Sequence, residues 1–171
     1  MDFKQLVRQV SDFPKPGFEF WDITPLLADA QAFGRAMEAM AAPVLTLQPT
    51  HVLGLESRGF IFGSALAQKL GLGFVPARKP GKLPGSTLQE SYLTTDGSED
   101  ALEIHKGAFK PGDRVLIVDD VLATGGTAAA ARKLIERTGA QPIALTLFVE
   151  VGELPGREKL KGLPVFSLLR V

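Results

Sequence analysis

Hydrophobic residues in this chain form short unbroken runs, separated by longer segments in which apolar positions recur every three or four residues. The clearest run, Val115–Val118, has four apolar side chains without polar alternation, which is typical of a strand buried on both faces of a parallel sheet. Comparable runs lie at 51–55, 73–77, 142–150 and 164–169. This alternation predicts an α/β fold in which helices flank a mostly parallel central sheet.

The spacing of apolar residues also predicts where the helices lie. Phe3–Val10 fits a short amphipathic helix, and 30–47 fits a longer one. Two further helices are expected after polar turns, one ending at Leu70 and one ending at Arg137. Residues 101–105 alternate in polarity, so we expect a strand there that pairs as a hairpin with the central apolar run.

Two adjacent carboxylates and a glycine-rich turn follow the central run. Neighbouring strand residues point to opposite faces of a sheet, so Asp119 and Asp120 are expected where the strand ends and meets water or a ligand. Residues 124–127 read Thr-Gly-Gly-Thr and open an alanine-rich helix, whose amino terminus and free backbone amides make an anion site. Together these features predict a cradle for a ribose 5-phosphate. A plain strand-to-helix connection is the alternative, whereas a Walker loop and a dinucleotide fingerprint are excluded because their glycine patterns do not occur at this junction.

Length, charge and cysteine content narrow the class of protein. The 171 residues suit one domain, and a formal net charge of zero argues against recruitment of nucleic acid or an anionic membrane. There is no cysteine, and the two histidines are far apart in sequence, so neither a thiolate nor a histidine metal site is expected. No apolar run approaches the roughly 20 residues of a spanning helix, and the first residues lack a signal-peptide pattern, so we expect a cytoplasmic protein.

An aromatic segment follows a rigid turn near the amino terminus. Residues 14–17 read Pro-Lys-Pro-Gly, and Phe18, Phe20 and Trp21 come directly after them. Ring faces suit flat heterocycles, and exposed backbone amides can read the edges of a base, so this segment is a candidate stacking platform. Packing of the rings in the core is the alternative.

Two sets of basic residues are candidates for binding an anion. Arg58 lies between a predicted strand and the start of a helix, where its guanidinium adds to the helix dipole and favours a phosphate. Arg78, Lys79 and Lys82 are interleaved with prolines and glycines that exclude a helix or an inner strand. We interpret this loop as a mobile lid that closes over a polyanion and excludes water, with a solvated charged loop as the alternative.

Four segments, in this order, resemble motifs of the adenine phosphoribosyltransferases, a group of the type I phosphoribosyltransferase family. They are the Asp-Phe-Pro-Lys-Pro-Gly segment with the aromatic residues and Asp-Ile-Thr-Pro after it (12–25), the Glu-Ser-Arg-Gly-Phe turn (56–60), the Arg-Lys-Pro-Gly-Lys-Leu-Pro loop (78–84) and the Asp-Asp to Thr-Gly-Gly-Thr stretch (119–127). The resemblance covers nearly the whole chain. It implies the type I phosphoribosyltransferase fold as a single domain over 1–171, with a small hood over about 11–27 and a flexible lid over about 78–100.

The resemblance also implies a role for each matching residue. Asp119 and Asp120 would hold the ribose hydroxyls, and the 5-phosphate would be held by Ala123, Thr124, Gly125, Gly126 and Thr127. Pyrophosphate would be held by Glu56, Ser57, Arg58, Arg78, Lys79 and Lys82, with a strained cis peptide at Glu56–Ser57. The base would stack on Phe20 and bind the main chain of Glu19 and Trp21, above a floor at 149–151.

The chain departs from the family's motifs at two positions. Trp21 stands where an arginine is usual, so any side-chain contact of that arginine has no counterpart here. Thr95 stands where the family has a glutamate thought to assist proton transfer at the base. Asp96 is the nearest acid that could serve there, with Glu90 and Glu99 as alternatives.

The activity that the resemblance implies is the conversion of adenine and 5-phosphoribosyl 1-pyrophosphate to AMP and pyrophosphate, with Asp119, Asp120, Arg58 and Asp96 as catalytic residues. Mg²⁺ would arrive bound to phosphoribosyl pyrophosphate rather than in a protein metal site, and the chain would form a homodimer with lid residues near the partner. No nucleic acid or membrane partner is expected. Two other functions stay open, namely a phosphoribosyltransferase for guanine or hypoxanthine, and a non-catalytic regulator that senses phosphoribosyl pyrophosphate.

Overall fold

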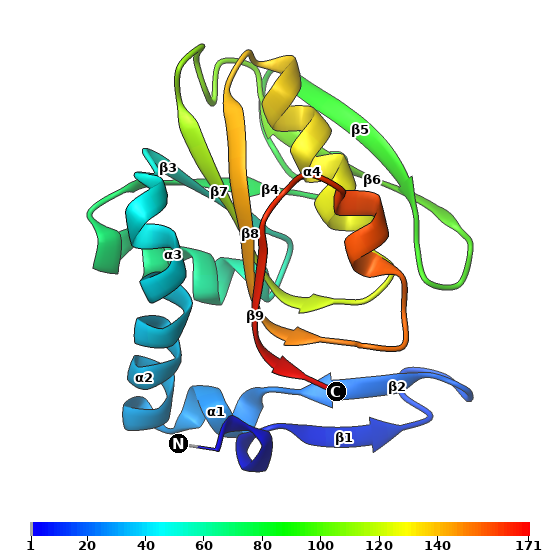
Figure 1. Ribbon diagram of the computed structural model, residues 1–171. Coiled ribbons are helices and arrows are strands. Elements are labelled where there is room, and N and C mark those ends of the chain that lie inside the picture. Colours follow the sequence, from blue (N-terminus) through cyan, green and yellow to red (C-terminus); the bar gives the residue numbers. More distant parts are fainter. Residues whose placement is uncertain (1) are drawn as a thin grey trace.

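The computed structural model describes residues 2–171, which form a central sheet with helices on both faces and two smaller pairs of strands (Figure 1). The helices are η1 (Phe3–Leu6), α1 (Thr24–Ala28), α2 (Ala30–Ala41), η2 (Ala42–Leu47), α3 (Gly59–Leu70), α4 (Gly126–Arg137) and η3 (Gly156–Leu160), where η marks a 3-10 helix. The strands are β1 (Arg8–Ser11), β2 (Glu19–Asp22), β3 (His51–Leu55), β4 (Gly73–Ala77), β5 (Thr87–Leu93), β6 (Glu99–His105), β7 (Arg114–Leu122), β8 (Gln141–Glu150) and β9 (Val165–Arg170). Within residues 2–171, no helix has both the length and the apolar character needed to cross a membrane.

Five strands form a parallel sheet in the order β4-β3-β7-β8-β9, as the apolar runs predicted. β7 lies at its centre, and its side chains alternate between two cores. Val115 and Ile117 join the core that contains α4, whereas Leu116 and Val118 join the core that contains α2 and α3. Burial on both faces explains why this strand has no polar alternation.

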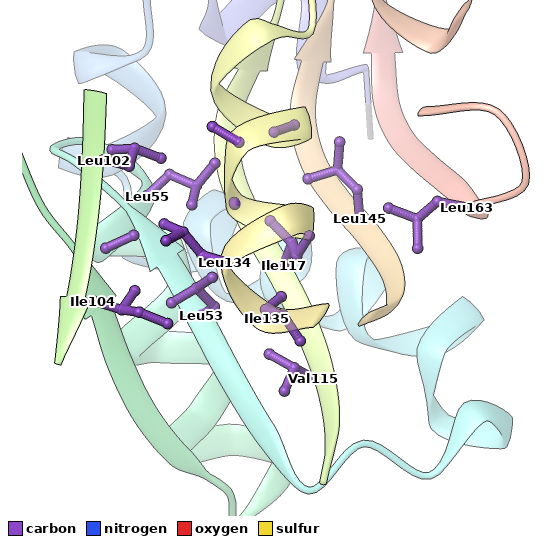
Figure 2. Close-up of a cluster of buried hydrophobic side chains, with 14 of the residues drawn as sticks. Leu53, Leu55, Leu102, Ile104, Val115, Ile117, Leu134, Ile135, Leu145 and Leu163 are labelled. Atoms are coloured by element: carbon purple, nitrogen blue, oxygen red, sulfur yellow. The ribbon is translucent and has the colours of Figure 1, made fainter. Parts of the chain in front are cut away.

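The two cores fix the strands from opposite faces. In one, Leu53 and Ile117 of the sheet lie close to Leu134 and Ile135 of α4 (Figure 2). In the other, the rings of Phe62 and Phe148 stack with their centres 5.7 Å apart. Full burial of such a side chain contributes about 1.5–3 kcal/mol, so both cores hold the carboxyl ends of the strands in fixed positions.

The acidic pair lies near the carboxyl end of β7, as predicted, with two further residues of the strand after it. β3 pairs with β7 only as far as Gly54 opposite Val118, whereas β8 continues beside β7 to Glu150 opposite Leu122. Because β3 ends early, the sheet edge is open next to Asp119. The strand can therefore carry both carboxylates without placing them in the apolar core.

The prediction of a helix over Phe3–Val10 is wrong. Only Phe3–Leu6 is helical, and Arg8–Ser11 forms β1, which pairs with β2 in antiparallel fashion. Across this pair Arg8 Nη2 lies 2.7 Å from Asp22 Oδ2. Pairing with β2 supplies hydrogen-bond partners for the backbone amides and carbonyls of β1. The spacing of apolar residues within 3–10 carries no information about this partner, so it could not predict the strand.

The segment after the basic loop also differs from the prediction. Residues 87–105 form the β5–β6 hairpin, and the expected pairing of 101–105 with β7 is wrong. Both edges of β7 are occupied by β3 and β8, so β6 pairs with β5 and packs Leu102 and Ile104 into the core near α4. Within the predicted lid, only 79–86 and the turn at 94–98 have no helix or strand.

Candidate active site

The two carboxylates of β7 lie at the open sheet edge beside one arginine. Arg58 Nε is 2.6 Å from Asp120 Oδ2, the distance of an ion pair, but the contact lacks hydrogen-bond geometry, so this buried oxygen has no hydrogen-bond partner among residues 2–171. Asp119 Oδ1 accepts a hydrogen bond of 2.9 Å from the Asp120 amide. Burial raises the pKa of Asp119, and the neighbouring Asp120 charge raises it further; burial also raises the pKa of Asp120, against the opposing effect of Arg58. Hydroxyl groups of a ligand could supply the donors that the protein leaves out.

The glycine loop, residues 123–127, turns from β7 into α4 in a confined space. Gly125 has a φ of +76°, and a Cβ atom there would collide with the carbonyl oxygen of Gly156. A Cβ atom on Gly126 would lie 2.5 Å from the carbonyl oxygen of Leu93. The loop is therefore pressed between the start of η3 and the end of β5, and glycine is required at both positions.

The turn after β3 binds the start of the basic loop, residues 78–86. Glu56 accepts hydrogen bonds from the Lys79 amide at 2.5 Å and from Arg78 Nη2 at 3.3 Å. Burial acts to raise the pKa of Glu56, but these two partners lower it on balance. The Glu56–Ser57 peptide is cis, as the resemblance implied.

The side chain of Lys79 is bound to the β5–β6 hairpin. Its Nζ donates a hydrogen bond of 2.7 Å to the Tyr92 hydroxyl and forms an ion pair with Asp100. Burial acts to lower the pKa of Lys79, but the bonds to Asp100 and Tyr92 raise it on balance, so the cation is retained. Lys82 is exposed, and its side chain forms no ion pair within residues 2–171.

The hood, residues 11–27, brings the ring of Phe20 to the site. Arg58 Cζ lies 4.6 Å from the centre of this ring, and the Phe13 ring meets it edge-on with centres 5.0 Å apart. The guanidinium of Arg58 therefore contacts both the carboxylate Asp120 and the hood. An aromatic face at this point is suited to a flat ligand.

The residues on either side of Phe20 direct their side chains elsewhere. Glu19 Oε2 accepts a hydrogen bond of 2.9 Å from Gln9 Nε2 on β1. Trp21 packs against the core that contains α2 and α3, and it borders the hood pocket described next. The main chain of Glu19 and Trp21 remains the part of these residues that a ligand beside Phe20 could bind.

Three adjoining pockets connect these parts. One of about 150 Å³ is lined by the glycine loop and Asp119, and one of about 530 Å³ is lined by residues 56–58 and both carboxylates. The hood pocket, of about 960 Å³, lies between the hood and the hairpin turn at 94–98. Because Val121 and Ala123 line all three, the pockets form one continuous site along the carboxyl edge of the sheet.

Most residues predicted for the site come together in these pockets. The lining includes Glu19, Phe20, Trp21, Glu56, Ser57, Arg58, Lys79, Asp96, Asp119, Asp120, Ala123, Thr124, Gly125, Gly126 and Thr127. Arg78 and Lys82 line none of the three. Tyr92 was not predicted as a site residue, because its position depends on the pairing of β5 with β6, which no local pattern indicates.

Asp96, the predicted proton carrier, is held as an anion at the hairpin turn. Its Oδ1 accepts hydrogen bonds from the hydroxyls of Thr94 at 2.6 Å and Ser98 at 2.7 Å, and Lys15 Nζ lies 3.0 Å from its Oδ2. These bonds, with that of Thr94 as the largest, hold the pKa of Asp96 far below its usual range. A carboxylate whose oxygens are engaged in this way and whose pKa is lowered is a weak base that accepts a proton poorly, so these contacts do not support the predicted role.

Comparisons with known proteins agree with the fold. The phosphoribosyl transferase domain family matches residues 26–165 of the chain. A protein of Carboxydothermus hydrogenoformans named adenine phosphoribosyltransferase is 54% identical over 170 residues, which are 99% of each chain.

Solved structures give the same result. The crystal structure of adenine phosphoribosyltransferase from Rhodothermus marinus is 48% identical, covers 99% of this chain and 96% of its own, and superposes with a TM-score of 0.94. The Saccharomyces cerevisiae enzyme, solved with adenine and an imino-altritol bisphosphate, is 40% identical over 98% of this chain and 97% of its own, with a TM-score of 0.92. Family match, full-length identity and fold therefore agree, and the chain belongs to the adenine phosphoribosyltransferases of the type I phosphoribosyltransferase family.

Proposed function

We propose that this protein converts adenine and 5-phosphoribosyl 1-pyrophosphate to AMP and pyrophosphate, a step of purine salvage. The observation that carries the proposal is the continuous site at one sheet edge. It joins a glycine loop suited to a phosphate, a carboxylate pair beside Arg58 suited to a ribose and its leaving group, and an aromatic hood suited to a base. The yeast relative was solved with adenine and a bisphosphate, ligands of the same chemical classes as the base and the phosphates proposed here.

In this reaction the bond between the anomeric carbon and a pyrophosphate oxygen breaks, a bond from that carbon to a purine nitrogen forms, and the nitrogen releases its proton. Asp119 and Asp120 hold the ribose hydroxyls, and their charge offsets the positive charge that develops on the ribose ring. Arg58 stabilises the negative charge on the departing pyrophosphate. Each hydrogen bond to a charged group of this kind contributes roughly 1.5–3 kcal/mol.

The basic loop reaches the pyrophosphate by exchanging partners. Arg78 and Lys79 are paired with Glu56 and Asp100 inside the chain, so they bind a ligand by giving up these carboxylates for phosphate oxygens. Lys82 needs no such exchange because it is exposed and forms no ion pair within the described chain. Closure of this loop would exclude water from a reactive ribose cation.

Mg²⁺ would enter with the phosphoribosyl pyrophosphate. No group of three or more His, Cys, Asp or Glu within residues 2–171 could hold a metal by itself. The carboxylates nevertheless fit such an ion, because Asp120 Oδ2 lacks a hydrogen-bond partner in the described chain and Mg²⁺ prefers carboxylate and phosphate oxygens. When bound, the ion would offset charge on the leaving group.

Adenine would lie in the hood pocket. Phe20 would stack on the ring system, the main chain of Glu19 and Trp21 would bind its edges, and Val151, which lines this pocket, would form part of the floor. Trp21 in place of the usual arginine leaves these main-chain contacts intact, because its side chain packs on the core.

We also propose that the protein is a homodimer. This proposal rests on the resemblance to the family. Ile61 of α3 and Leu93 of β5, large apolar side chains with 40% and 59% of their surface exposed, are candidates for contact with a second copy. Light scattering during size-exclusion chromatography would measure the mass. The cytoplasmic location stays a prediction from the sequence.

A pyrophosphate-release assay with phosphoribosyl pyrophosphate, Mg²⁺ and one purine at a time tests the proposed activity. We expect release with adenine, together with an equal amount of AMP. Equal or faster release with guanine or hypoxanthine would assign the protein to another base. Binding of phosphoribosyl pyrophosphate without release for any purine would contradict catalysis and identify a sensor.

A further inference from the structure

The hood and the β5–β6 hairpin meet across the hood pocket although they are far apart in sequence. The loop between β1 and β2 and the turn between β5 and β6 project on the same side of the molecule, at the right of Figure 1. Lys15 of the hood and Asp96 of the hairpin turn both line the pocket, and Lys15 Nζ lies 3.0 Å from Asp96 Oδ2. Within residues 2–171, this contact is the only hydrogen bond or ion pair that joins the hood to the hairpin.

The carboxylate end of this contact is held in place before the lysine arrives. Thr94 and Ser98 donate their hydroxyls to Asp96 Oδ1, which leaves Oδ2 for Lys15. The turn itself is closed by the Thr94 amide, which donates a hydrogen bond of 2.9 Å to the Ser98 carbonyl oxygen. Asp96 is therefore a fixed negative charge at the edge of the pocket.

The lysine end is positioned by the hood. Lys15 Nζ lies 4.9 Å from the centre of the Phe18 ring, close enough for a cation–π contact. The Lys15 carbonyl oxygen accepts a hydrogen bond of 3.3 Å from the Phe18 amide, and Asp12 Oδ1 accepts one of 2.8 Å from the Gly17 amide. These two hydrogen bonds within residues 12–18 stabilise the turn that carries Lys15.

We propose that the Lys15–Asp96 pair is an ionic latch that closes the mouth of the purine pocket, and that Asp96 is a positioning residue for adenine rather than a proton carrier. The inference rests on the proposed function, because it takes the hood pocket as the site of the purine. The side chains are 56% and 36% exposed, so the pair lies at the solvent edge of the pocket. Exposed pairs are weak and are screened by salt, so the latch can open to admit adenine and release AMP.

Lys15→Gln and Asp96→Asn test the latch. Asparagine keeps an oxygen for Thr94 and Ser98 and replaces the carboxylate oxygen that Lys15 binds by an NH2 group, which cannot accept a hydrogen bond. With phosphoribosyl pyrophosphate saturating, we expect each variant to raise the KM for adenine about 3- to 5-fold and to leave kcat within about 2-fold, as is typical for loss of an exposed pair. The double variant should be no worse than either single variant. High salt should raise the KM of the wild-type protein and leave that of the variants unchanged.

Glu136→Gln is the matched control. It removes an ion pair of similar exposure, with Arg132 Nε 2.8 Å from Glu136 Oε1 near the carboxyl end of α4, and should leave both constants unchanged. Effects of Lys15→Gln and Asp96→Asn that multiply in the double variant, or a KM that neither changes, would overturn the latch. A loss of kcat of about 100-fold in Asp96→Asn alone would identify a proton carrier instead.

The wild-type protein separates this inference from the activity on which it rests. No AMP from the wild-type protein would overturn the proposed function and the latch together. An active wild-type protein whose two variants keep its KM would overturn the latch alone.

Discussion

The site has two halves that are built differently: the carboxylates and the glycine loop at the sheet edge, and the hood with the hairpin turn at 94–98. At the edge, Asp119 and Asp120 lie on a nine-residue strand between two apolar cores, and the glycine loop has no room for a side chain at Gly125. Residues 11–20 of the hood and the hairpin turn at 94–98 lie outside the two cores, and one exposed ion pair joins them. Groups fixed by buried packing suit a reacting centre that needs accurate placement, whereas peripheral elements with few buried contacts open easily. The ribose-phosphate half is therefore a fixed template, and the base half is a movable cover.

Arg58 is the residue that the two halves share. Its Nε contacts Asp120 at the sheet edge, while its Cζ lies over the Phe20 ring of the hood. Because the same guanidinium serves both, a ligand that moves one half can affect the other.

The largest expected effect comes from the fixed half. Asp120→Asn removes the charge that opposes the developing ribose cation, and loss of one such interaction costs about 100-fold in kcat. The fold should be kept, because asparagine has the shape of aspartate and Asp120 Oδ2 accepts no hydrogen bond within the described chain, so that only the ion pair with Arg58 is lost. Steady-state rates and a thermal unfolding curve measure the two properties. Asp29→Asn is the matched control, since Asp29 caps α2 away from the site and asparagine caps equally well. Wild-type rates in Asp120→Asn would contradict the role of the carboxylate.

Gly125→Ala should damage both folding and phosphate binding. The added Cβ would meet the Gly156 carbonyl oxygen, and the φ of +76° strains any residue with a side chain. We expect a loss of about 2–4 kcal/mol of unfolding free energy, measured by urea titration, from overpacking and strain together. Gly162→Ala is the control for strain alone, because Gly162 has a φ of +84° and open space around it. Equal losses of unfolding free energy in Gly125→Ala and Gly162→Ala would show that the glycine loop is not sterically confined.

Removal of the stacking ring should affect the movable half. Phe20→Ala should raise the KM for adenine about 10-fold, because stacking of a base on an aromatic ring contributes roughly 1–3 kcal/mol. Leu45→Ala, which truncates an apolar side chain that is 59% exposed, is the control for a general effect of truncation. An unchanged KM for adenine in Phe20→Ala would place the base elsewhere.

A smaller effect is expected at the support of the η3 turn. Glu150 accepts hydrogen bonds from Arg157 Nε at 2.6 Å and from Ser167 Oγ at 2.6 Å. The bonds from Arg157, helped by Ser167, lower the pKa of Glu150 to about 2. A lowered pKa in the folded state means that this stabilisation is present above about pH 4.5 and is lost as the pH falls toward 2. The wild-type protein should therefore lose more unfolding free energy between pH 7 and pH 3 than Glu150→Gln does, by on the order of 2 kcal/mol, measured by urea unfolding. An equal loss of unfolding free energy in Glu150→Gln and the wild-type protein would contradict the stabilising role of the Glu150 carboxylate.

The sequence was sufficient for the fixed half because its signals are local. An apolar run without alternation predicted β7, and the Asp-Asp and Thr-Gly-Gly-Thr pattern located the carboxylates and the glycine loop next to it. Arg58 was also found from its place between a strand and a helix. Each of these residues acts where its own element puts it.

The movable half was predicted less well because its structure depends on distant partners. Residues 8–11 became a strand only by pairing with β2, and residues 87–93 became one only by pairing with β6. The ion pair between Lys15 and Asp96 joins positions 81 residues apart, and no local pattern indicates it. The role of Asp96 was therefore predicted from its neighbourhood in sequence, whereas its contacts in space point to a different role.

The most direct test of separable halves is the binding of phosphoribosyl pyrophosphate with Mg²⁺, measured by titration calorimetry without adenine. If the sheet edge and the basic loop hold this substrate without the hood, Phe20→Ala should bind it within about 3-fold of the wild-type protein, and Asp120→Asn should bind it at least about 10-fold more weakly. Equal loss of binding in the two variants, or unchanged binding in Asp120→Asn, would contradict the account.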